Sequence, residues 1–300
     1  MANITKWDTI WHSRGDNASW HRGIILTGGR GLPATQPEER GNPMHEAEKS
    51  IHEFDFNLIG EYFSSIERQG PGSPQATLQA LSFIGNLTAD SRIADLGCGT
   101  GGQTMVLAQH TPGSITGLDL FPVFIDRFNA RARELHLHER VTGVVGSMDN
   151  LPFHDEELDL IWSEGAIYNI GFVRGVTEWR RYLKPGGWLA VSEASWFTSE
   201  RPAEIDRFWK DEYPEIDTIP VKVAQMQQAG YIPAAAFILP ETCWTEHYYE
   251  PQAAMQAKFL QQHAGERTAE ALVANIRHEA EMYARYKAFY GYVFYIGRKV

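Results

Sequence analysis

A glycine-rich turn at residues 93–102, with the sequence IADLGCGTGG, contains the residues whose spacing indicates chemistry most clearly. Gly97, Gly99 and Gly102 form a GxGxxG pattern, which in dinucleotide-binding proteins lets the backbone approach a pyrophosphate at a helix N-terminus. Asp95, however, stands two residues before the first glycine, where its carboxylate would repel a pyrophosphate. The same carboxylate would attract a cation such as an amino group. The turn therefore predicts a ligand with a positive charge near Asp95.

Further candidates for chemistry lie where predicted strands end, because the carboxyl ends of parallel strands meet at one edge of a sheet. Ser163 and Glu164 close an apolar run, and Tyr168 follows in the next loop. Glu164 can act as a general base, or it can be a carboxylate held by a helix N-terminus or a tyrosine, and both interpretations stay open. Glu193 and His247 are further candidates for proton transfer. We predict Glu164 and Tyr168 as the catalytic residues.

Neither a metal site nor a disulfide is expected. The eleven histidines are scattered and show no ligand spacing for zinc or iron. The two cysteines, Cys98 and Cys243, cannot build a disulfide framework, and Cys98 lies inside the glycine turn. These features predict a protein of the reducing cytoplasm.

The composition limits the possible partners. Three hundred residues, of which 43% are hydrophobic and 22% charged, predict a soluble globular chain with a sizeable core. The net charge of −11 disfavours a broad electrostatic contact with nucleic acid or with an anionic membrane surface. No apolar run approaches the ~20 residues that span a bilayer, and the N-terminus lacks an export signal. A small molecule is the expected partner, and a homodimer is left open.

The elements that position these residues alternate along the chain. Short apolar strands are predicted at residues 92–97, 114–120, 140–146, 158–164 and 187–195, the last after a turn at 184–187. Helices are predicted between them at residues 103–110, 122–135 and 173–183. Strands that alternate with helices in this way indicate a parallel sheet covered on both faces.

Both flanks depart from this alternation. Residues 1–48 are rich in Gly and Pro and are predicted to form an irregular extension before a domain at 49–300. Two helices are expected before the first strand, one over residues 54–63 and one that begins at the Ser73 cap and Pro74.

After the fifth strand we predict a helix at 221–229, a strand at 233–239, a long helical stretch at 251–290 and a terminal strand at 291–299. Segments at about 50–72, 196–230 and 250–290 fall outside the alternating sheet and are expected to form a helical lid. The charges of residues 266–287 are predicted to be the solvated face of a helix.

In its motifs the chain resembles the class I S-adenosylmethionine-dependent methyltransferases. Their acidic residue followed by GxGxG is present as Asp95, Gly97, Gly99 and Gly101, and Asp119 stands at the end of the second strand. The segments GSMDNLPF and LKPGGWLAVSE are likewise similar to family motifs, and the resemblance covers about residues 64–300. The small-molecule group typified by ubiquinone and menaquinone biosynthesis methyltransferases is most similar. The segments FSSIERQGPGSP and IWSEGAIYNIGF resemble uncharacterised bacterial members.

The resemblance implies a Rossmann-like, doubly wound α/β sheet of seven strands, mostly parallel with an antiparallel last strand. It implies S-adenosylmethionine as the cofactor, with Asp119 on the ribose hydroxyls and the loop around Arg68 and Gly70 over the methionine part. Ser147 stands where the group usually has Asp, which leaves the adenine contact open. The implied cofactor residues are Arg68, Gly70, Asp95, Gly97, Cys98, Gly99, Gln103, Asp119, Leu120, Ser147, Met148 and Ser163.

The expected activity is in-line transfer of a methyl group to a small molecule in a covered, apolar pocket. Aromatic residues suggest that pocket as a group: Phe197, Phe208, Trp209, Tyr213, Trp244, Tyr248 and Tyr249. Two alternatives stay open. One is a sensor or partner subunit that binds S-adenosylmethionine without catalysis, and the other is an NAD(P)-dependent dehydrogenase, for which no catalytic His or Tyr/Lys arrangement is found.

Overall fold

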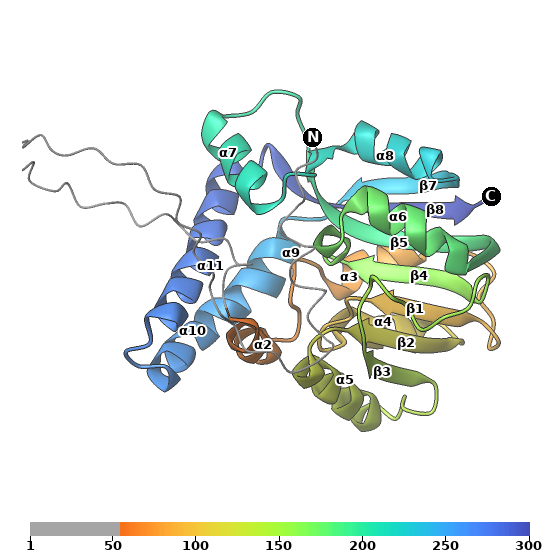
Figure 1. Cartoon of the computed structure of the whole chain (residues 1–300), viewed down its shortest axis with the longest axis horizontal. Coiled ribbons are helices and arrows are strands. Elements are labelled where there is room, and N and C mark those ends of the chain that lie inside the picture. Colours follow the sequence, from red (N-terminus) through yellow and green to blue (C-terminus); the bar gives the residue numbers. More distant parts are fainter. Residues whose placement is uncertain (1–54) are drawn as a thin grey trace, which may run out of the picture. The chain divides into compact units, whose positions relative to one another are not determined.

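The structure, a computed structural model, describes residues 55–300, so the extension predicted for residues 1–48 lies outside the described part. A mixed sheet forms its centre (Figure 1). Its strands follow the order β3-β2-β1-β4-β5-β8-β7, and a two-residue strand, β6, pairs with β5. The strands are β1 (Arg92–Leu96), β2 (Ser114–Asp119), β3 (Val141–Val145), β4 (Leu158–Glu164), β5 (Leu183–Trp196), β6 (Asp217–Thr218), β7 (Tyr231–Ile238) and β8 (Tyr290–Lys299).

The strand directions confirm the predicted fold class. Strands β3, β2, β1, β4 and β5 run parallel, whereas β8 is antiparallel to both β5 and β7. The sequence did not predict β6, which adds an eighth strand beside the seven of the main order. The separate turn predicted at residues 184–187 is wrong, because β5 continues through it with a register shift opposite Leu158 and Leu160.

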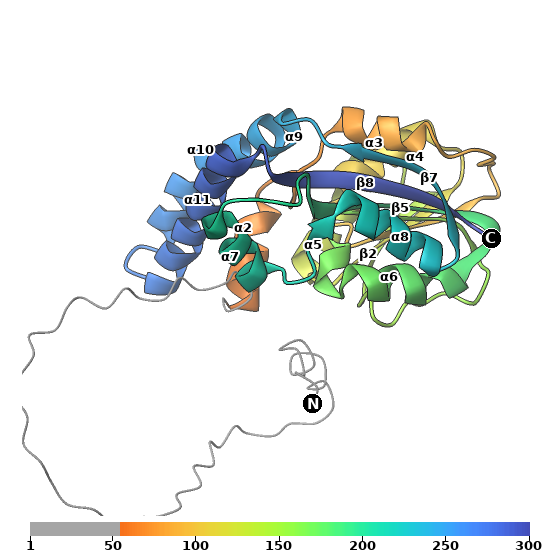
Figure 2. The same cartoon turned by 90° about the horizontal axis from the view of Figure 1, so that it is seen from above.

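Helices cover both faces of the sheet, with α3 and α4 on one side and α6 and α8 on the other (Figure 2). These helices are α3 (Pro74–Leu81), α4 (Gly102–His110), α6 (Phe172–Trp179) and α8 (Ile219–Gln228). Helix α5 (Pro122–Glu134) packs through Phe128 on β2 and β3, where a Cβ at Gly117 or Gly143 would stand 2.6 or 2.7 Å from the ring. The two glycines therefore let α5 approach the strands that lead to the predicted ribose residue.

Two local signals in the sequence explain where helices begin. The Ser73 hydroxyl accepts a hydrogen bond from the Ala76 backbone at 3.1 Å, and Pro74 occupies the first turn of α3, as predicted. Helix α4 begins differently, at Gly101 with φ +87° and without a side-chain cap. Its first N–H groups are therefore available to a ligand at the glycine turn.

A second group of helices gathers at the end of the sheet toward which the parallel strands run (Figure 1). These are α2 (Phe56–Ser64), α7 (Ala203–Glu212), α9 (Thr242–Trp244), α10 (Glu250–Gln262) and α11 (Arg267–Tyr286), with a π-helical turn at Thr245–Tyr249. The prediction of one helical stretch at 251–290 is wrong, because residues 263–266 separate α10 from α11 and Gly265 takes φ +84°. The helix predicted at 173–183 is also shorter, since α6 ends at Trp179 in a 3-10 turn.

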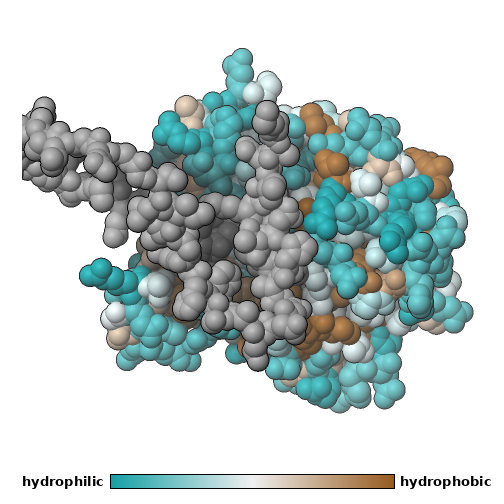
Figure 3. Space-filling view, viewed as in Figure 1, coloured by the Kyte–Doolittle hydropathy of each residue, from teal (hydrophilic) through white to brown (hydrophobic). Residues whose placement is uncertain are grey.

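The visible surface of the described residues is mostly polar, with separate apolar patches (Figure 3). The exposed large apolar residues come from several different elements, among them Phe83, Val173 and Ile232. Within residues 55–300, no helix combines the length and the apolar character that a membrane crossing requires.

Candidate functional site

The glycine turn joins β1 to α4 in a tight, left-handed course. Gly97, Gly99 and Gly101 have φ values of +73°, +55° and +87°, which side chains with a Cβ rarely adopt. The backbone N–H groups of Gly97 and Cys98 donate to the Leu118 carbonyl at 2.8 and 3.1 Å and fix the turn to β2. A Cβ at Gly97 or Gly99 would collide with side chains that lie over the turn. The turn is therefore a close-fitting backbone cradle.

Asp95 lies completely buried below this cradle. Its Oδ2 accepts a hydrogen bond from the Thr104 hydroxyl at 2.5 Å, whereas its Oδ1 has no partner among the described residues. Burial raises the pKa of Asp95 to about 8, against the effect of Thr104. An orphaned carboxylate oxygen at this depth fits a ligand that brings a hydrogen-bond donor or a positive charge, as the amino acid part of S-adenosylmethionine does.

Asp119 lies beside the same turn, at the end of β2. Its Oδ2 accepts from the Gly99 backbone at 2.8 Å and its Oδ1 from the Phe121 backbone at 3.1 Å. Burial raises its pKa, and these backbone hydrogen bonds oppose the shift. Leu120, the next predicted contact, is half-buried. Asp95 and Asp119 thus both lie at the glycine turn, and their predicted contacts with the cofactor stay predictions.

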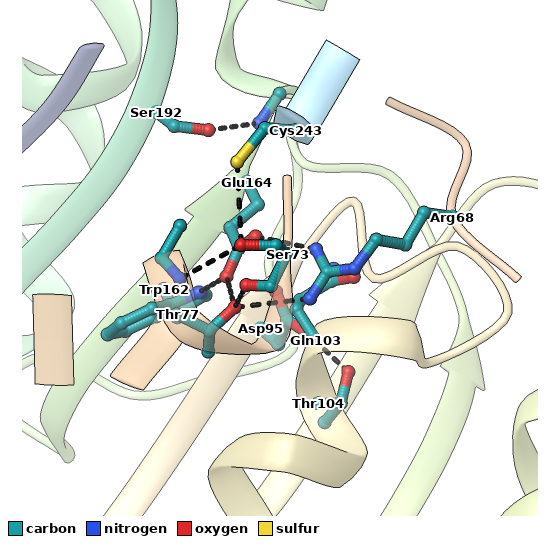
Figure 4. Close-up of polar contacts among 12 residues, drawn as sticks. Arg68, Ser73, Thr77, Asp95, Gln103, Thr104, Trp162, Glu164, Ser192 and Cys243 are labelled. Atoms are coloured by element: carbon teal, nitrogen blue, oxygen red, sulfur yellow. Dashed lines mark hydrogen bonds and ion pairs between the residues drawn. The ribbon is translucent and has the colours of Figure 1, made fainter. Parts of the chain in front are cut away.

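Arg68 and Glu164 form a buried ion pair next to the cradle (Figure 4). Arg68 Nη1 donates to Glu164 Oε2 at 2.8 Å, and Arg68 Nη2 donates to the Thr77 hydroxyl at 3.2 Å. Glu164 Oε1 also accepts from Thr77 at 2.6 Å and from the Trp162 indole at 3.0 Å. Because three donors occupy the carboxylate, the geometry favours a positioning role for Glu164 over proton transfer. The guanidinium group is likewise held by protein partners.

Gln69, the neighbour of Arg68, joins this loop to the glycine turn. Its Oε1 accepts from the Thr100 backbone at 2.9 Å, and its Nε2 donates to the carbonyls of Phe63 and Ile66 at 3.1 and 2.9 Å. Gly70 adjoins the backbone of the loop that follows β4. A polar residue in a loop already assigned to the cofactor was the signal that could have identified Gln69.

Ser147 and Met148 follow β3 at the edge of the turn. The Ser147 hydroxyl donates to Asp149 Oδ2 at 3.2 Å, and Asp149 forms an ion pair with Arg174 at 2.6 Å. The Met148 carbonyl accepts from the Trp179 indole at 3.1 Å, and its methyl group lies close to the first glycine of the turn. These contacts fix the loop in which the adenine contact is predicted.

Three further predicted cofactor residues make internal contacts. The Ser163 hydroxyl donates to the Leu96 carbonyl at 2.8 Å and links β4 to β1. Gln103 Nε2 donates to the Cys98 carbonyl at 3.3 Å. Cys98 is a free, buried thiol whose pKa burial raises well above its usual value, so it acts as a small neutral residue in the turn.

The candidates for proton transfer lie in different environments. Tyr168 is half-buried, and burial raises its pKa to about 12, so its phenol is protonated near neutral pH. Glu193 is buried, accepts from Lys222 at 3.0 Å and also receives a hydrogen bond from Tyr213. Burial raises the pKa of Glu193 although Lys222 opposes the shift. His247 is half-buried in the π-helical turn. Within residues 55–300, no group of three or more His, Cys, Asp or Glu could hold a metal ion.

Comparison with known proteins agrees with this geometry. A family model described as a methyltransferase domain matches residues 94–191, from β1 to β5. A sterol 24-C-methyltransferase of Candida albicans is 29% identical over 164 residues, which are 50% of this chain and 43% of that protein. A ubiquinone/menaquinone biosynthesis C-methyltransferase of a Geobacter species is 30% identical over 119 residues, 39% of this chain and 50% of that protein. The chain thus spans half or less of the length of these relatives.

A solved structure covers more of the chain. An S-adenosylmethionine-dependent methyltransferase from Geobacter sulfurreducens, in complex with S-adenosyl-L-homocysteine, superposes with a TM-score of 0.71 at 19% identity. The match covers 81% of this chain and 98% of that one. The fold is therefore Rossmann-like, and the acidic glycine turn lies within it at the end of β1. Residues 94–191 match a methyltransferase domain, and the fold of the chain is similar to that of a solved S-adenosylmethionine-dependent methyltransferase.

Proposed function

We propose that this protein transfers a methyl group from S-adenosylmethionine to a small-molecule acceptor by in-line displacement. The observation that carries the proposal is the unpaired Oδ1 of Asp95, buried at the base of a left-handed glycine turn and accompanied by Asp119. Two carboxylates at this place suit a cationic cofactor and disfavour a pyrophosphate. The match of residues 94–191 to a methyltransferase domain supports the same conclusion.

Each part of the site has a proposed task. The glycine turn would hold the amino acid part close to Asp95, and Asp119 would bind the ribose hydroxyls. The loop around Gln69, which the Arg68–Glu164 pair fixes to the end of β4, would cover the cofactor and exclude water. When bound, S-adenosylmethionine supplies an electrophilic methyl group on a positively charged sulfur. The protein then mainly has to align the acceptor and keep water out.

Binding separates the cofactor alternatives. Isothermal calorimetry of the full chain should show heat with S-adenosylmethionine and none with NAD. Binding of NAD alone would establish the dehydrogenase alternative in its place. Transfer of a radioactive methyl group to a cell extract separates an enzyme from a sensor, because a sensor would bind the cofactor tightly and label no acceptor.

The finer parts of the proposal follow from single features. Cys98 and Cys243 are both free and buried, which suits a reducing cytoplasm. The division into an extension at 1–48 and a domain at 49–300 with lid elements is proposed from the sequence pattern. A homodimer stays a prediction.

A further inference from the structure

Five aromatic residues pack together at the end of the sheet, four from the helical segments and Tyr292 from β8. They are called here the aromatic cage: Trp244, Tyr248, Tyr249, Tyr283 and Tyr292. The Trp244 ring stacks on Tyr283 at 4.3 Å between centroids and meets Tyr292 edge-on at 4.9 Å. Tyr249 lies 5.1 Å from Tyr248 and 6.0 Å from Tyr283. The Trp244 indole N–H is buried and has no partner among the described residues, so one wall of the cage offers an unused donor.

The aromatic cage shares a loop with the glycine turn. A Cβ at Gly165 would stand 2.8 Å from the Tyr292 ring, and the next residue, Ala166, lies against Gly97. The segment after β4 therefore contacts both the cage and the predicted cofactor turn. A small molecule in the cage would lie next to that turn.

One carboxylate, Glu279, belongs to this cage. It occupies the inward stripe of α11, three residues after buried Ile276 and four before buried Tyr283. Tyr249 donates its phenolic hydrogen to Glu279 Oε1 at 3.0 Å. The side chain is only half-buried although its neighbours on the stripe are buried. A group that lies inside an aromatic cluster and still meets solvent is placed to meet a ligand.

The electrostatic surroundings of the cage are negative. Burial is the main cause of the raised pKa of Tyr168, and the charges of Glu279, Glu193 and Glu212 add to it. The charge of Glu279 also contributes to the raised pKa values of Tyr248, Tyr249, Tyr290 and Tyr292. The nearby cation of Lys222 is already paired with Glu193. Aromatic faces together with an anionic group attract an organic cation.

We propose that the aromatic cage and Glu279 bind the ammonium group of a small amine, and that an amine is the methyl acceptor. This inference rests on the proposed function, because it names the acceptor of that same site. An ammonium nitrogen has no free electron pair, so it must lose a proton first. The N–H bond breaks, an O–H bond forms on Glu279, and the nitrogen keeps the electron pair that it needs as an acceptor. Burial raises the pKa of Glu279 to about 7, with Tyr249 opposing and Glu212 adding to the shift, which suits such an exchange near neutral pH.

The test measures binding of a cation and of a neutral molecule of similar size and shape. Tetramethylammonium and tert-butanol are titrated into the full chain, with and without S-adenosyl-L-homocysteine, and followed by saturation-transfer NMR. We expect tetramethylammonium to bind about tenfold more tightly than tert-butanol. Glu279→Gln should remove this preference and leave the affinity for S-adenosyl-L-homocysteine unchanged. Glu281→Gln, on the exposed side of the same helix, is the matched control and should keep the preference.

Each outcome decides a separate question. Equal affinity for the two probes, no binding of either, or a preference that survives Glu279→Gln would overturn the assignment of the cage to an amine. Failure of wild-type protein to bind S-adenosyl-L-homocysteine would instead contradict the proposed function, and the comparison of the probes still reports on the cage. Glu279→Gln keeps the shape of the side chain and removes a charge that burial disfavours, so we expect it to fold. Circular dichroism checks this.

Discussion

The buried pair of Arg68 and Glu164 permits a quantitative test of how the loop over the glycine turn is held. The side chains are 7% and 3% exposed, and the pair joins residues 96 positions apart in the chain. Loss of one member leaves the other charge buried without a counter-charge, which costs about 3–5 kcal/mol. We therefore expect Arg68→Met and Glu164→Gln each to lower the free energy of unfolding by about this amount. For a domain of this size the melting temperature should fall by roughly 6–20 °C.

The double variant Arg68→Met/Glu164→Gln tests whether the two residues stabilise the fold as a pair. When both charges are removed, the amide oxygen introduced by Glu164→Gln can still accept from Thr77 and Trp162, which donate to the native carboxylate at 2.6 and 3.0 Å. The double variant should therefore lose far less stability than the sum of the single losses, with a coupling of about 3 kcal/mol. Urea unfolding of the wild type and the three variants measures this coupling. Additivity within about 0.5 kcal/mol would refute the reasoning.

The same variants separate two roles of Glu164. If Glu164 positions the loop, Arg68→Met and Glu164→Gln should both lower the affinity for S-adenosylmethionine, because the pair fixes the segment that carries Gln69 over the turn. If Glu164 accepts a proton from the substrate, Arg68→Met should leave the cofactor affinity intact. Calorimetry with S-adenosylmethionine distinguishes the two results.

Three further predictions concern the cradle and the buried ion pair beyond it. Asp119→Ala should raise the dissociation constant for S-adenosylmethionine by about 10- to 100-fold, which is more than we expect for Glu164→Ala. If calorimetry shows the larger increase for Glu164→Ala, the ribose does not bind at Asp119. Gly99→Ala should weaken cofactor binding, because the new Cβ would collide with the Gln69 side chain over the turn. Gly265→Ala is the control: it has the same strained positive φ but open space around the new Cβ, so this variant should bind the cofactor normally. Lys222→Met leaves the carboxylate of Glu193 buried without its counter-charge, and burial already raises the pKa of Glu193 above its value in the unfolded chain. The variant should therefore be most stable in acid and lose stability as pH rises through the pKa of Glu193 in the folded protein. Urea unfolding at about pH 5 and about pH 8 should differ by a few kcal/mol, and an equal stability at both would contradict this.

The central sheet was predictable because its signals are local. Strands β1 to β4 are short apolar runs, and α3, which precedes β1, begins at a cap that the sequence shows. The break at residues 263–266 and the short strand β6 were not predicted, because neither interrupts the hydrophobic pattern. The ion pair of Arg68 with Glu164 could not be predicted either, because the sequence does not specify which loops meet in the folded chain.

Glu279 is the exception to a prediction that the other charged residues of α11 confirm. The charges of residues 266–287 were predicted to form a solvated face, and seven of them are exposed: Glu266, Arg267, Glu270, Arg277, Glu281, Arg285 and Lys287. Glu279 differs, because it is half-buried on the stripe of Leu272, Ile276 and Tyr283, which are buried. A carboxylate on an apolar stripe is costly unless partners compensate its charge. The neutral phenol of Tyr249 supplies it with one hydrogen bond and no positive charge. The hydrogen bond from Tyr249 therefore leaves the charge of Glu279 without a counter-charge, and the proposed ammonium group of the acceptor would supply it.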